Sequence, residues 1–203
     1  MITVVLGEQR GDEGKGRFVD MLAEEHDIVA RFNGGNNAGH TVVLPDGRVL
    51  KLHGVPSGIA HPNTMNVIGN GCLVNPIKLI QEIDDIRSQN IEVSPKNLMI
   101  SNGAHLTLPH YISEDEIREA GKGGQGSTKM GIAQVASAKY LRTGVRAEMI
   151  VHDMDGLIAA VRAGLETQRE ARKSVGLDAL DEEVVVAQFI ESAKQLVEFI
   201  GDT

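Results

Sequence analysis

The chain of 203 residues, with 41% hydrophobic and 24% charged residues, has an ordinary globular composition and is long enough for one large domain or two small ones. Its formal net charge of −8 excludes a general electrostatic attraction to nucleic acid or anionic membranes. Nucleic acid is further disfavoured because aromatic residues, on which bases stack, make up only 3% of the chain.

Cysteine content and hydropathy indicate a cellular compartment. The single cysteine, Cys72, excludes an intrachain disulfide, and the chain opens without a charged and apolar leader. No apolar stretch approaches the roughly 20 residues that span a bilayer. We therefore expect a protein of the reducing cytoplasm without a membrane partner.

The first predicted element is a buried β-strand at residues 2–6, an apolar and largely β-branched run. It leads into a glycine-rich loop at residues 7–16, and the apolar spacing of a helix follows at residues 18–25. This order favours a phosphate site, because backbone N–H groups and the positive end of the helix dipole converge there. Lys15 would supply a cation.

The loop departs from the standard phosphate-loop pattern, G-x-x-x-x-G-K-[ST]. Gln9 replaces the first glycine, and Gly16 replaces the hydroxyl residue that normally holds magnesium. Another oxygen donor is then needed, and Asp12 is the candidate because Mg²⁺ prefers carboxylates together with phosphate oxygens. The alternative is a glycine-rich turn with a surface aspartate.

A second strand is predicted at residues 28–32. Strand, helix and strand form a βαβ unit, which favours a parallel sheet with ligand loops at the carboxyl ends of its strands. The next loop, residues 33–41, would then lie beside the first one. It carries His40, whose ordinary pKa suits donation of a hydrogen bond or a proton to a phosphate. A satisfied structural histidine is the alternative.

Local patterns predict the middle of the chain. Pro76 begins a helix that should direct Leu79, Ile83 and Ile86 to the core and Glu82, with Lys78 and Asp85, to water. The other predicted elements are a hairpin of 42–44 and 49–52, short strands at 67–68 and 73–74 around a turn, and strands at 98–100 and 104–108. Five histidines without metal-ligand spacing are given structural or surface roles: His53, His61, His105, His110 and His152.

Residues 113–131 are rich first in charge and then in glycine, which predicts a mobile loop. Ser127 and Thr128 follow the glycines and suit a second phosphate or a ribose hydroxyl. An N-cap for the helix predicted at 132–142 is the alternative. For Arg142 at the end of that helix, one interpretation is a solvated base that complements the helix dipole.

The apolar pattern of residues 153–203 predicts helix throughout. In its second part, apolar residues that should face the core recur at alternating spacings of four and three: Val186, Ile190, Ala193, Val197 and Ile200. We therefore expect an α/β fold with a mostly parallel central sheet, flanking helices and a helical C-terminal segment. The chain is interpreted as a single domain or domain fragment over 1–203, in which 1–112 and 126–150 carry the nucleotide-site loops.

Five ordered motifs resemble the amino-terminal part of the adenylosuccinate synthetase family: residues 11–16, 34–41, 55–59, 68–71 and 126–128. The likeness covers most of residues 1–150 and is weaker beyond them. Members of that family are about twice as long, so the chain is similar to their first half. The resemblance implies a P-loop-like GTP-binding architecture, Mg²⁺ as cofactor and a cytoplasmic homodimer. It also implies the GTP-dependent ligation of L-aspartate to IMP through 6-phosphoryl-IMP, a step of purine nucleotide biosynthesis.

Carried over by position, the resemblance makes Asp12 the catalytic base, His40 the catalytic acid and Lys15 a catalytic cation. It assigns the GTP and phosphate contacts to Gly11, Asp12, Glu13, Gly14, Lys15, Gly16, Arg17, Gly39, His40 and Thr41. It assigns the IMP contacts to Asp12, Glu13, Gly14, Lys15, Asn37, Ala38, Gly39, His40, Thr128 and Arg142. Arg142 would come from the neighbouring subunit, and Mg²⁺ would be held by Asp12 and the carbonyl of Gly39.

The chain departs from the family in two places. Arg10 replaces the usual tryptophan, and residues 129–134 replace a glycine- and proline-bearing stretch. The guanine-specificity motif and the aspartate-binding loop of the family lie beyond residue 203, so we expect the fragment alone not to complete catalysis. Two alternatives stay open: a phage-type relative that acts on dGMP, and a non-catalytic phosphate-binding module. Asp12 favours the IMP enzyme, because phage-type relatives tend to lack it.

Overall fold

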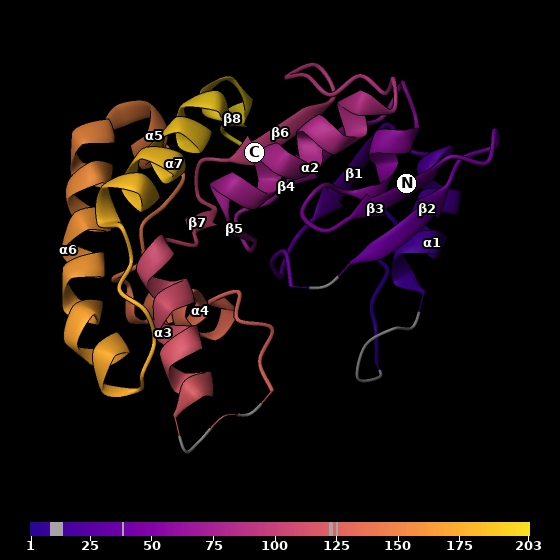
Figure 1. The fold of residues 1–203 in the computed structure, drawn as a ribbon. Helices are drawn as coiled ribbons and strands as arrows, with labels where there is room; N and C mark the ends of the chain where they lie inside the picture. The colour runs from indigo at the N-terminus through magenta and orange to yellow at the C-terminus, as the bar shows by residue number, and fades with distance from the viewer. Residues whose placement is uncertain (9–13, 38, 122–123, 125) are drawn as a thin grey trace.

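The computed structural model describes residues 1–8, 14–37, 39–121, 124 and 126–203. Its centre is a four-stranded sheet of order β1-β4-β6-β8, in which every neighbouring pair is parallel (Figure 1). The strands are Ile28–Arg31 (β1), Met65–Ile68 (β4), Leu98–Ser101 (β6) and Ile200–Gly201 (β8). The predicted α/β class with a parallel central sheet is confirmed.

Two smaller strand pairs flank this sheet. His40–Val43 (β2) and Val49–Leu52 (β3) are antiparallel, which confirms the predicted hairpin. Leu73–Val74 (β5) and His105–Leu106 (β7) are parallel. The hairpin alternates between buried and exposed residues, because successive side chains of a strand point to opposite faces, and it sends Leu50 and Leu52 into the core.

The helices cover the sheet and extend beyond it on one side (Figure 1). They are Lys15–Ala23 (α1), Pro76–Ser88 (α2), Pro109–Ala120 (α3), Ile132–Leu141 (α4), Glu148–His152 (α5), Met154–Ser174 (α6) and Glu182–Gln195 (α7), with the 3₁₀ turns Ser57–Ala60 (η1) and Val197–Phe199 (η2). α7 packs on α2 and α6, and α3 packs on α4 and α6. None of the described helices is long and apolar enough to cross a membrane.

Three helices begin with a side-chain cap. Asn75 accepts a hydrogen bond from the backbone of Lys78 at the start of α2. Asp153 does the same for Gly156 in α6, and Asp181 for Val184 in α7. These caps satisfy backbone N–H groups that have no partner within the helix, so the helix starts are defined locally.

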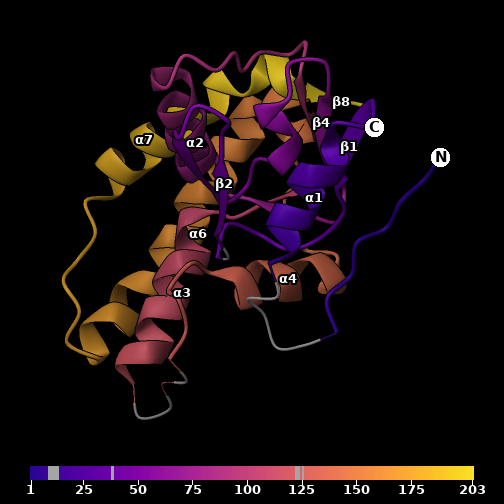
Figure 2. The same ribbon diagram turned by 90° about the vertical axis from the view of Figure 1, so that its right-hand side faces the viewer.

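The N-terminal strand prediction is wrong. Residues 2–6 form no strand, and Ile2, Val4 and Leu6 are 92%, 64% and 67% exposed. Figure 2 shows this segment leading away from the rest of the ribbon. The residue types of a segment indicate that it could form a strand, but they do not show whether the edge of a sheet is available to pair with it. The predicted βαβ unit of residues 2–32 is therefore absent. A parallel strand pair with a helix between its strands in the chain is found instead in β4, α2 and β6.

Two other predictions need correction. Residues 113–120, interpreted as loop, belong to α3, where the acidic side chains lie on a helix that buries Tyr111 and Ser113. The helix predicted to the end of the chain stops at Gln195, and Ile200 instead pairs with Ile100 in the sheet. Val197, predicted to face the core, is 41% exposed. In both regions tertiary contacts override the local pattern.

Candidate functional site

The candidate site lies at the N-terminus of α1. Gly14 precedes the helix in the left-handed conformation, with φ of 73°, and its carbonyl accepts hydrogen bonds from the backbones of Arg17 and Phe18. A helix start of this kind presents N–H groups and a positive dipole end to an anion. The predicted contacts Gly11, Asp12 and Glu13, and also Ala38, lie outside the described residues.

His40, at the start of β2, lies directly against this helix. A Cβ added to Gly16 would stand 2.5 Å from Cβ of His40, closer than side chains approach one another. The structure thus brings together the two predicted loops at this point. It also explains the departure from the phosphate-loop pattern, since His40 occupies the space that a serine or threonine at position 16 would need.

The environment of His40 keeps its ring neutral. Burial, together with the positive charge of Arg31 and the neighbouring ring of His53, lowers the pKa of His40 to about 4, although Asp20 opposes this shift. Its Nε2 is buried without a hydrogen-bond partner among the described residues. An anion beside the ring would favour the protonated form, because opposite charge raises the pKa of a histidine.

Two contacts from η1 and the residue after it hold α1 in place. The hydroxyl of Ser57 donates to the carbonyl of Gly16 at 3.1 Å. Nε2 of His61 lies 3.0 Å from Oδ1 of Asp20. The motif at residues 55–59 thus supports the start of the helix, a role that its sequence did not indicate.

The remaining predicted residues near α1 face outward. Lys15, Arg17, Asn37, Gly39 and Thr41 are all exposed. Gly39 lies close to the ring of His53: a Cβ added to Gly39 would stand 2.9 Å from Cε1 of that ring. Exposure around the helix start leaves these groups accessible to a ligand. Among the described residues no cluster of His, Cys, Asp and Glu could hold a metal ion, and the predicted ligand Asp12 lies outside them.

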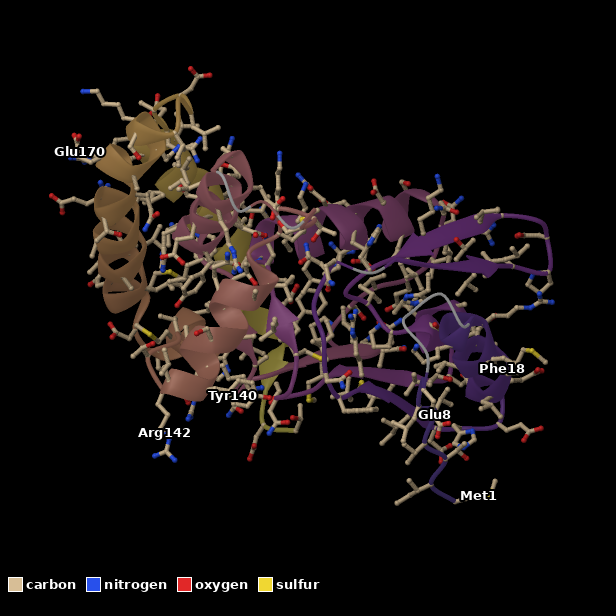
Figure 3. All side chains as sticks on the ribbon, turned by 90° about the horizontal axis from the view of Figure 1, so that it is seen from below. Met1, Glu8, Phe18, Tyr140, Arg142 and Glu170 are labelled. Carbon is tan, nitrogen blue, oxygen red and sulfur yellow. The ribbon has the colours of Figure 1, made fainter. Side chains whose placement is uncertain are left out.

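Thr128 and Arg142 lie elsewhere. Thr128 is exposed, while Ser127 donates its hydroxyl to Asp115 at 2.8 Å. The N-cap alternative for these residues is wrong, because α4 begins after Gly131 without a side-chain cap. Arg142 ends α4 in the left-handed conformation and points outward, at the opposite end of the molecule from Phe18 of α1 (Figure 3).

Sequence reasoning missed two charged residues close to the site. Glu82, predicted to face water, is only 6% exposed and accepts hydrogen bonds from the backbone of residues 53–55. Its spacing was a usable signal, since it lies three residues after Leu79 and four before Ile86, on the buried stripe of α2. Arg31, at the end of β1, donates to the carbonyls of Asn33, Gly35 and His53, and no local pattern pointed to it.

A parallel sheet, a glycine turn into a helix and a histidine packed on that turn define an α/β protein with the arrangement of a phosphate-binding site. The family model "Adenylosuccinate synthetase" matches residues 4–203. The chain belongs to the adenylosuccinate synthetase family, whose members are ligases.

Individual members of the family are similar to nearly the whole chain. The adenylosuccinate synthetases of Caldanaerobacter subterraneus subsp. tengcongensis and Clostridium perfringens are each 41% identical to the chain, over 100% and 98% of it. The match takes in 47% of each relative, so the chain spans about half the length of these relatives.

Solved structures agree. The fully ligated adenylosuccinate synthetase of Plasmodium falciparum superposes with a TM-score of 0.80 at 32% identity, covering 97% of this chain and 45% of that one. The succinoaminodeoxyadenylate synthetase of cyanophage S-2L, bound to dGMP and dATP, gives 0.51 at 26% identity, covering 65% of this chain and 36% of that one. The Plasmodium enzyme therefore matches a larger part of the chain.

Gly16→Ser tests the packing of His40. The added side chain is expected to push the imidazole from its buried place into water, and the pKa of His40 should then rise from about 4 toward its ordinary value, because desolvation is the largest cause of the depression. NMR titration of the His40 ring in the 203-residue chain measures this. Gly121→Ser is the control, since a Cβ there meets its nearest atoms at 3.5 and 3.6 Å. A His40 that still titrates near pH 4 in Gly16→Ser would contradict the described contact.

Proposed function

We propose that the chain forms the amino-terminal half of a GTP-dependent adenylosuccinate synthetase. The enzyme ligates L-aspartate to IMP and yields adenylosuccinate, GDP and phosphate. The observation that carries the proposal is the packing of His40 on Gly16 at the start of α1, in a chain that matches the family over residues 4–203. The proposal treats residues 1–203 as a single α/β domain or domain fragment in which 1–112 and 126–150 carry the nucleotide-site loops.

The chemistry divides into two displacements. Asp12 removes the proton from N1 of IMP, and O6 attacks the γ-phosphorus of GTP, so that an O–P bond forms while the bond to GDP breaks. The amine of aspartate then displaces phosphate from C6. Lys15, His40 and the backbone N–H groups at the start of α1 bind and neutralise the transferring phosphoryl oxygens. Asp12 and the carbonyl of Gly39 are the groups that would hold Mg²⁺, which would supply further positive charge when bound.

The proposal includes a homodimer. Arg142 lies at the opposite end of the molecule from Phe18 of α1, which supports the proposal that it reaches the nucleotide of a second subunit (Figure 3). Its neighbours Tyr140 and Leu141 are 84% and 71% exposed, and two adjacent exposed side chains of this size suit a subunit contact. Membership of the family supports the further proposal of a cytoplasmic enzyme of purine biosynthesis.

The test is an assay of a hybrid protein in which residues 1–203 replace the matching part of the Clostridium perfringens relative. We expect GTP-dependent phosphate release with IMP and L-aspartate, and none from residues 1–203 alone. Turnover with dGMP in place of IMP would support a phage-type enzyme instead. A hybrid that unfolds cooperatively but accepts neither nucleotide would point to a non-catalytic phosphate-binding module.

A further inference from the structure

The turn after β3, residues 53–55, is held by hydrogen bonds to the buried carboxylate of Glu82. Glu82 accepts hydrogen bonds from the backbone N–H groups of His53 at 2.7 Å, Gly54 at 2.8 Å and Val55 at 3.1 Å. A buried charge is costly unless it is hydrogen-bonded, and bonds to an ionised acceptor are stronger than neutral ones. Glu82 therefore ties this turn firmly to α2.

The glycine-rich loop that follows β1 is held by hydrogen bonds from the guanidinium of Arg31. Nε of Arg31 donates to the carbonyl of Asn33 at 3.1 Å, and Nη2 donates to the carbonyl of Gly35 at 2.5 Å. Gly34, between them, has a φ of 82°, and a Cβ on it would stand 3.2 Å from Nη2. The loop thus folds closely around the guanidinium, whose fork of donors matches several carbonyls at once.

Arg31 and Glu82 both form hydrogen bonds to the backbone of His53. The carbonyl of His53 accepts a hydrogen bond from Nη1 of Arg31, while its N–H bonds to Glu82. The ring of His53 in turn lies against Gly39, so the turn is linked to the loop directly at Gly39 and through Arg31 at Asn33 and Gly35. Arg31 and Glu82 also line the same small cavity, of about 20 Å³. Moving either charged residue would therefore shift the loop relative to α1.

We propose that Arg31 and Glu82 are positioning residues that together set the conformation of the loop after β1, over its described residues 33–37 and 39–41. They act through the peptide of His53 and fix where Asn37, Gly39 and His40 stand relative to the start of α1. The dependence of the loop on these residues stands on the contacts above. Only its consequence for nucleotide binding rests on the proposed function.

Hydrogen exchange on the 203-residue chain tests the proposal without any nucleotide. The variants are Arg31→Lys, which keeps the charge but loses the fork of donors, and Glu82→Gln, with Arg162→Met in an exposed ion pair to Glu183 as control. Both site variants are expected to accelerate amide exchange in residues 34–41 by about tenfold or more and to leave α6 unchanged. Equal acceleration in the loop and α6, or none in the loop, would show a merely general effect on stability and overturn the proposal.

The hybrid protein supplies a second measurement. Arg31→Lys is expected to raise KM for IMP by about tenfold with a smaller change in kcat, because it removes positioning of bound nucleotide rather than a reacting group. An unchanged KM in an active hybrid overturns the proposal. If the unmodified hybrid accepts no nucleotide, the proposed function fails, and the exchange experiment alone decides the role of the two residues.

Discussion

Gly71→Ala is expected to destabilise the protein by about 3 kcal/mol or more. A Cβ at this position would stand 1.8 Å from the carbonyl oxygen of Phe32 and 3.0 Å from its carbonyl carbon. Both atoms belong to the backbone at the end of β1, so no side-chain rotation can relieve the clash. The turn at residues 69–71 would have to move away from the strand, and with it the hydrogen bond from the backbone of Gly69 to Arg31.

Urea unfolding of the 203-residue chain measures this effect. The matched control is Gly47→Ala at the tip of the hairpin, where φ is 86° but no atom lies within 4 Å of the new Cβ. The control should lose only about 1 kcal/mol from backbone strain. If the two variants unfold at the same urea concentration, the close approach of Gly71 to Phe32 does not exist in solution.

Asp12→Asn is expected to lower turnover of the hybrid protein by about 10²–10⁴-fold, the usual contribution of a general base. The amide cannot accept the N1 proton of IMP, so O6 stays a poor nucleophile. IMP binding should be largely retained, because the glycine loop, Lys15 and the helix start are unchanged. Phosphate release and calorimetric binding of IMP measure the two quantities separately.

The control for this variant is Asp46→Asn, which removes the same charge from an exposed residue paired with Arg48 in the hairpin turn. It should leave turnover unchanged. Full activity in Asp12→Asn would remove this carboxylate from the proposed mechanism, and loss of IMP binding together with turnover would make it a ligand-binding group instead.

The elements that were predicted well depend on neighbours in sequence. The hairpin of β2 and β3 follows from alternating apolar residues around a Pro-Asp-Gly turn, and α2 follows from Pro76 and its apolar spacing. A helix after the first glycine loop was also predicted, at residues 18–25, and α1 begins three residues earlier, at Lys15. Each of these patterns acts over a few residues, so no distant contact is needed to specify it.

The predictions that failed depend on distant partners. The spacing of Glu82 in α2 could have indicated that it is buried, but not that its carboxylate accepts hydrogen bonds from the backbone N–H groups of residues 53–55. Residues 2–6 have the composition of a strand, yet they pair with no edge of the sheet in the described structure. Arg31 looks like an ordinary strand residue until the glycine loop closes on its guanidinium.

The family and the parallel α/β class could be predicted without a structure, because ordered motifs and local periodicity involve residues close together in the chain. Only the tertiary structure decided that His40 fills the space beside Gly16 and that Arg31 and Glu82 hold the loops around it. The physical reason is that buried charge and close packing are satisfied by groups many residues away, whose distance from one another is set only when the chain folds.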